Sequence, residues 1–95
     1  MSAWSDDETF LRKVGQQIQK ERKNNSLTQK QLAPQLGLSV ITLSQIERGV
    51  AGTTLKTLFK IAKKLNVSPA QLILNSDEIL FLKSDIAKLY LRVNK

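Results

Sequence analysis

Apolar residues recur every three or four positions through most of the chain, which is the period of an amphipathic helix. Near the N-terminus this pattern predicts one helix, ending at the turn-forming residues 24–26, with a buried stripe made of Phe10, Leu11, Val14 and Ile18. Ser5 and Glu8 match a capping box, so we expect the helix to begin there. Gly15 lies inside it at a cost of about 1 kcal/mol relative to alanine. That cost suggests that another backbone passes close to Gly15.

The stretch 27–49 predicts two short helices joined by a turn at Gly37. The first, at 27–36, has apolar residues at 32, 33 and 36, and the second, at about 40–48, has them at 43 and 46. Thr28 and Ser39 precede these helices as N-caps, and Gly37 can adopt the left-handed conformation that ends a helix. Two helices joined in this way form a helix-turn-helix, whose second helix can enter a DNA major groove.

Pro34 is an anomaly in the first of these helices. It lies beyond the first turn and lacks the N–H that would bond to the carbonyl of Lys30, at a cost of about 3 kcal/mol in a regular helix. We therefore expect a kinked or partly unwound helix.

Two more helices follow before residue 75. Thr54 can cap a helix with a broad apolar face, and Ser68-Pro69 opens another that runs through Leu72, Ile73 and Leu74. The sequence thus predicts an all-α protein, namely a five-helix repressor-like helix-turn-helix domain plus an additional C-terminal amphipathic helix. We divide the chain into an N-terminal extension of the first helix at 1–13, the helix-turn-helix domain at 14–74 and a C-terminal helix at 75–95.

The C-terminal segment has its own apolar pattern, with a spacing of three and four residues that makes a seam of about two heptads. We expect this helix to dock on the domain and also to pair with a second copy of the chain, so that the protein is a homodimer. The alternative is simple packing on its own domain. The predicted dimerisation residues are Ile79, Leu82, Ile86, Leu89 and Val93.

The chain carries a net charge of +7, which favours an anionic partner. Residues 12–30 carry +5 and residues 51–66 carry +4, whereas residues 1–11 carry −3. The two basic blocks flank a helix-turn-helix that is itself nearly neutral. Solvation of helix faces by lysines is the simpler reading, but the flanking arrangement favours nucleic acid.

The composition argues against several other classes of protein. The 95 residues include no cysteine and no histidine, so thiolate catalysis and most metal sites are excluded, and we expect no enzyme activity, no metal and no cofactor. The longest apolar run, residues 79–82, is far too short for a membrane span, and the N-terminus is acidic where a signal peptide would be basic. We expect a soluble, cytoplasmic chain without a membrane partner.

Residues 14–73 resemble the Xre family, the phage-repressor and Cro type of helix-turn-helix domain. The resemblance rests on Val14-Gly15-x-x-Ile18, Arg22, Leu27-Thr28-Gln29-x-x-Leu32-Ala33, Leu36-Gly37-Leu38-Ser39, Leu43-x-x-Ile46-Glu47-Arg48-Gly49 and Leu58-x-x-Ile61-Ala62-x-x-Leu65-x-Val67-Ser68. It implies a five-helix domain that usually binds operator DNA as a dimer.

The resemblance also implies a set of DNA-binding residues. Gln29 matches a glutamine that contacts backbone phosphate, and Gln45 can form a bidentate pair with adenine. Thr53 and Thr54 match a second phosphate clamp, and Arg22 and Glu47 match a structural ion pair. The whole predicted DNA-binding set is Thr28, Gln29, Lys30, Ser39, Val40, Ile41, Thr42, Ser44, Gln45, Thr53 and Thr54.

Val40 and Ile41 depart from the family pattern, which often has polar or basic side chains there. They can only pack on thymine methyl groups, or they form an interface with a protein. Three functions stay open at this point. The first is a homodimeric transcriptional regulator, most simply a repressor, on double-stranded DNA. The second is an antitoxin that binds both DNA and a toxin protein, and the third is a protein-interaction module or coactivator.

Overall fold

The computed structural model describes residues 7–74, and this part of the chain is built from helices without any strand. The five helices are α1 (Asp7–Asn24), α2 (Gln29–Gln35), α3 (Val40–Glu47), α4 (Leu55–Leu65) and α5 (Pro69–Ile73). The prediction of an all-α, five-helix repressor-like domain is confirmed. Ser5 of the expected capping box, the expected helix at 75–95 and its five dimerisation residues lie outside the described residues.

Side-chain caps begin three of the helices where the sequence predicts them. Thr28 Oγ1 accepts a hydrogen bond from the N–H of Gln31 at 3.1 Å, and Ser39 Oγ accepts one from the N–H of Thr42 at 3.0 Å. Thr54 Oγ1 caps α4 in the same way at 3.1 Å. These bonds satisfy N–H groups that have no partner within the helix, so they determine where each helix begins.

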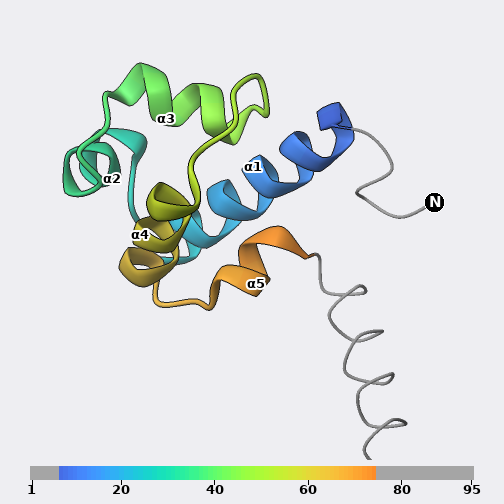
Figure 1. Cartoon of the computed structure of the whole chain (residues 1–95). Coiled ribbons are helices and arrows are strands. Elements are labelled where there is room, and N and C mark those ends of the chain that lie inside the picture. The colour runs from blue at the N-terminus through green and yellow to red at the C-terminus, as the bar shows by residue number, and fades with distance from the viewer. Residues whose placement is uncertain (1–6, 75–95) are drawn as a thin grey trace, which may run out of the picture.

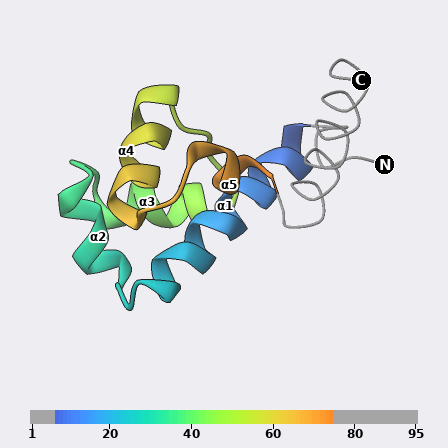
Figure 2. The same cartoon turned by 90° about the horizontal axis from the view of Figure 1, so that it is seen from below.

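The helices enclose a single apolar core. α1 packs against α3, α4 and α5, and α2 packs against α3 (Figure 1; Figure 2 shows the same arrangement from below). The core contains Val14, Ile18, Leu32, Ala33, Leu36, Leu43, Ile46, Leu58, Ile61, Ala62, Leu65 and Leu72. Because α1 packs against α3, and α3 packs against α2, α1 supports the helix-turn-helix pair mainly through α3.

The backbones of α1 and α3 come close together at Gly15. A Cβ atom added to Gly15 would collide with the backbone carbonyl oxygens of Ile46 and Glu47. The expectation that another backbone passes close to this glycine is therefore confirmed. The turn glycine between α2 and α3, Gly37, has the predicted left-handed conformation with φ of 69°.

Pro34 lies inside α2, and the helix continues through it to Gln35. Of the two expected effects, partial unwinding is therefore wrong, and a kink at Pro34 stays a prediction. The proline removes only the bond to the carbonyl of Lys30, and both residues are exposed, so water can bond to that carbonyl. Beyond the proline, the N–H groups of Leu36 and Gly37 donate to the carbonyls of Ala33 and Pro34 at 3.0 and 3.1 Å.

Candidate nucleic-acid interface

Helix α3 has one buried face and one face open to solvent. Leu43, Ile46 and Glu47 are buried against the rest of the domain. With 100° per residue, Ile41 and Gln45 fall on the opposite side, whereas Ser44 and Val40 fall toward its edge, next to Glu47. Val40 is 38% exposed and Ile41 71% exposed, and Ser44 and Gln45 are half-buried. A short helix along the edge of the domain (Figure 1) with such a face has the shape needed to enter a groove of DNA.

Gln45 is the best suited of these residues to read a base. Its side-chain amide makes no hydrogen bond to any residue between 7 and 74, although other glutamines in this region, such as Gln17 and Gln29, do make them. The amide of Gln45 therefore keeps both a donor and an acceptor for a ligand.

Arg48, directly after α3, belongs to the same exposed face and was not among the predicted DNA-binding residues. It follows Ser44 by four residues, and its Nε donates to Ser44 Oγ at 3.3 Å. Arg48 is exposed and is the only cation on this face among the described residues. The spacing of four residues from Ser44 was the signal that could have identified it.

A buried ion pair holds the end of α3 against α1. Arg22 Nε and Nη2 donate to Glu47 Oε2 and Oε1 at 2.7 and 3.0 Å, which is a bidentate arrangement. The two residues are 6% and 4% exposed. A third donor of Arg22, Nη1, bonds to the carbonyl of Leu27 at 2.7 Å, just before α2. One guanidinium therefore links α1 to the start of α2 and to the end of α3.

Gln29 is joined to this same pair. Its Nε2 donates to Glu47 Oε1 at 3.0 Å, so one N–H of the predicted phosphate-binding amide is already used inside the protein. The other N–H and the carbonyl oxygen of the half-buried side chain remain for a ligand. The sequence did not indicate this contact between α2 and α3.

The other predicted residues lie at the starts of helices. Thr28 and Lys30 are exposed at the start of α2, beside Gln29, and Ser39 is exposed at the start of α3, where its hydroxyl also donates to Thr42 Oγ1 at 2.9 Å. Thr53 and Thr54 directly precede α4, and Thr54 Oγ1 donates to Thr57 Oγ1 at 3.1 Å. The structure thus joins residues 28–30 to α3 through the bond between Gln29 and Glu47. Thr53 and Thr54 lie at a separate helix start, that of α4.

Within residues 7–74 we find no group of acidic residues that could hold a metal ion. In the same range, none of the five helices combines the length and the apolar character that a membrane crossing requires. The residues described above, from α3 and from the starts of α2 and α4, are therefore the ones considered for the interface.

Comparison with known proteins gives a consistent family. A family model described as Helix-turn-helix (HTH_3) matches residues 18–72, which include the end of α1, the helices α2 to α4 and all of α5 except its last residue. The chain is 37% identical over 65 residues to the HTH-type transcriptional regulator DicA of Escherichia coli. That match covers 68% of this chain and 48% of DicA, so the chain spans about half the length of this relative.

Two solved structures share the fold. The restriction-modification controller protein C.AhdI from Aeromonas hydrophila is 32% identical with a TM-score of 0.62, over 65% of this chain and 94% of that one. The regulator of biofilm formation SinR, solved in complex with DNA, is 32% identical with a TM-score of 0.59, over 62% of this chain and 95% of that one.

Proposed function

The chain belongs to the helix-turn-helix family HTH_3, the Xre type, and from this premise we propose that it is a transcriptional regulator that binds double-stranded DNA through α3. The main support for this proposal is the way in which α3 is held against the domain. Its inner face is buried in the core and tied by Glu47 to Arg22, while its outer face is left without partners from the described domain. A rigid helix with an open outer face can be placed in a major groove without refolding.

We assign different tasks to the residues of this surface. Gln45 reads adenine through its free amide, and Val40 and Ile41 pack on thymine methyl groups. Ser39, Thr42 and Ser44 supply hydroxyls that can bond to bases or phosphates. Arg48 binds a phosphate or a guanine at the end of the helix.

Two helix starts then hold the DNA backbone. Thr28, Gln29 and Lys30 at the start of α2 form one phosphate contact, and Thr53 and Thr54 before α4 form the other. Contacts of this kind set the orientation of the protein on the duplex but carry no sequence information. Specificity in this proposal therefore rests on α3.

We further propose that the protein acts as a homodimeric repressor on a two-fold operator, with half-sites about 34 Å apart. The support is the apolar seam in the sequence of the C-terminal segment. Changing Leu82 and Leu89 together to glutamate should convert a dimer to a monomer, as judged by mass in solution. A mass that stays at two chains would remove this segment as the main determinant of dimerisation.

The test of the proposed function begins with selection of bound sequences from a random DNA pool. The enriched duplex should bind at least about a thousandfold more tightly than random duplex at the same salt concentration, the lower end for specific regulators. Equal affinity for the two duplexes would leave only nonspecific binding.

A protein-interaction module is the second candidate, and the exposure of Ile41 at 71% on α3 favours it. The same selection separates the two, because an interaction module would enrich no sequence. The antitoxin hypothesis is tested by the neighbouring gene, which would encode the toxin.

A further inference from the structure

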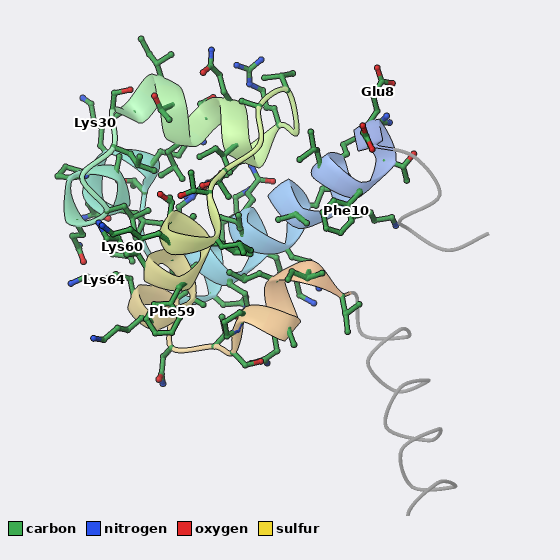
Figure 3. All side chains as sticks on the ribbon, viewed as in Figure 1. Glu8, Phe10, Lys30, Phe59, Lys60 and Lys64 are labelled. Carbon is green, nitrogen blue, oxygen red and sulfur yellow. The ribbon has the colours of Figure 1, made fainter. Side chains whose placement is uncertain are left out.

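A basic groove lies between the end of α2 and the second half of α4. It has a volume of about 500 Å³ and is lined by Gln35, Leu36, Gly37, Lys60, Lys63 and Lys64. Leu36 is almost fully buried, and the space beside Gly37 is open, because nothing lies within 4 Å of where its Cβ would be. In Figure 3, Lys60 and Lys64 extend from α4 toward the side of the molecule on which α2 lies.

The three lysines of this groove are not neutralised by the domain. They stand at positions 60, 63 and 64, so that one helix surface carries all three ammonium groups. The only ion pair among residues 7–74 joins Arg22 to Glu47, and no acidic residue lines the groove. Three exposed cations this close repel one another, so an anion that binds all three is stabilised by relief of that repulsion as well as by attraction.

We propose that this groove binds a ligand bearing two or more phosphate groups. Lysine ammonium groups bind phosphate as point charges, and three of them match a multiply charged ligand better than a single carboxylate. The volume is within the range of about 300 to 1,000 Å³ that holds small organic ligands, so there is room for more than one phosphate group. The ligand is either a free phosphorylated molecule or the backbone of a duplex.

The groove is distinct from the DNA-binding surface proposed above. None of its lining residues belongs to α3, to residues 28–30 or to residues 53–54. Binding of a free phosphorylated molecule in this groove does not depend on the proposed function. Binding of the backbone of a DNA duplex there does rest on the proposed function.

The first experiment uses the full chain and inorganic pyrophosphate at constant ionic strength. Amide resonances are followed by heteronuclear NMR. The largest shifts should occur at residues 35–37 and 60–64, with saturation. Shifts spread evenly over the lysines of α1 and α4, or no shifts, would overturn the groove as a site for a free ligand.

The second experiment compares two variants with the same loss of charge. K60Q/K63Q/K64Q removes the groove lysines, and K13Q/K20Q/K23Q removes three exposed lysines of α1 that do not line it. If the ligand is free, only the groove variant should lose pyrophosphate affinity, by about tenfold or more. If the ligand is the duplex backbone, only the groove variant should show a shallower salt dependence of DNA affinity, by about 2.7 units of the log-log slope for three phosphates. The proposal is overturned if the two variants change pyrophosphate affinity equally and also change the salt dependence of DNA affinity equally.

Discussion

Glu47 Oε1 accepts hydrogen bonds from both Gln29 Nε2 and Arg22 Nη2, each at 3.0 Å. The bond from Gln29 joins the start of α2 to the end of α3, and the bond from Arg22 fixes both to α1. A residue proposed to contact phosphate is thus held by the same buried carboxylate that orients the recognition helix. Stability of the domain and the geometry of DNA binding are therefore coupled through Glu47.

Removing the arginine should destabilise the fold. Arg22→Met leaves Glu47 as a buried, unpaired charge and removes the donor to the carbonyl of Leu27. We expect a loss of about 3 to 5 kcal/mol in the free energy of unfolding. Urea denaturation at neutral pH measures it.

The double variant Arg22→Met/Glu47→Met is the control for this effect. It removes the unpaired charge, so it should be more stable than Arg22→Met alone. A single variant that loses less than about 1 kcal/mol would place the pair among ordinary exposed ion pairs and contradict its structural role.

Gln29 and its neighbour Lys30 should affect DNA binding in different ways. Gln29→Ala removes a neutral amide, so affinity for random duplex should fall severalfold while the salt dependence is unchanged. Lys30→Gln removes a cation, so the log-log slope should decrease by about 0.9. Both are measured by fluorescence anisotropy over a range of salt concentrations. Unchanged affinity of Gln29→Ala would remove this residue from the interface.

Gln45→Ala should change specificity more than affinity. The variant should lose about 1 to 3 kcal/mol of discrimination between the selected duplex and one with a substituted adenine, since a bidentate pair is lost. Its affinity for random duplex should stay the same. Gln16→Ala, at an exposed position of α1, is the matched control. Discrimination equal to that of the control would assign readout to other residues.

Gly15→Ala should be destabilising although alanine favours helix. The added methyl group meets the backbone of Ile46 and Glu47, which has to move, and such overpacking costs about 1 to 3 kcal/mol. Gly52→Ala is the control, because its Cβ would meet only the Leu11 side chain at 3.4 Å. Thermal unfolding compares the two variants; equal midpoints would show that α1 and α3 can separate freely at Gly15.

Local features of the fold were predictable from the sequence. The caps at Thr28, Ser39 and Thr54 and the left-handed Gly37 depend on neighbouring residues only, so their side-chain chemistry was sufficient. The partial unwinding expected at Pro34 was wrong, because the cost of a proline inside a helix depends on whether the carbonyl that loses its partner, here that of Lys30, can bond to water.

Tertiary contacts in the candidate site were harder to predict from the sequence. The bond between Gln29 and Glu47 joins residues 18 positions apart, and a glutamine at a helix start gives no sign of such a partner. The basic groove was also missed, because it exists only where the turn at 35–37 lies beside α4. Charge counting located the lysines but not the surface that they share.

The most direct test of the central claim is the binding of random duplex by the wild-type chain and by Ile41→Glu as a function of salt. Ile41 is 71% exposed on α3, so a carboxylate there should leave the fold intact and repel the DNA. Gln16→Glu, at an exposed position of α1 that belongs to none of the proposed contacts, is the control that adds the same charge. We predict a steep log-log salt dependence for the wild type and the control, and an affinity at least about tenfold lower for Ile41→Glu. A flat salt dependence of the wild type, or equal affinities of the two variants, would contradict DNA binding through α3.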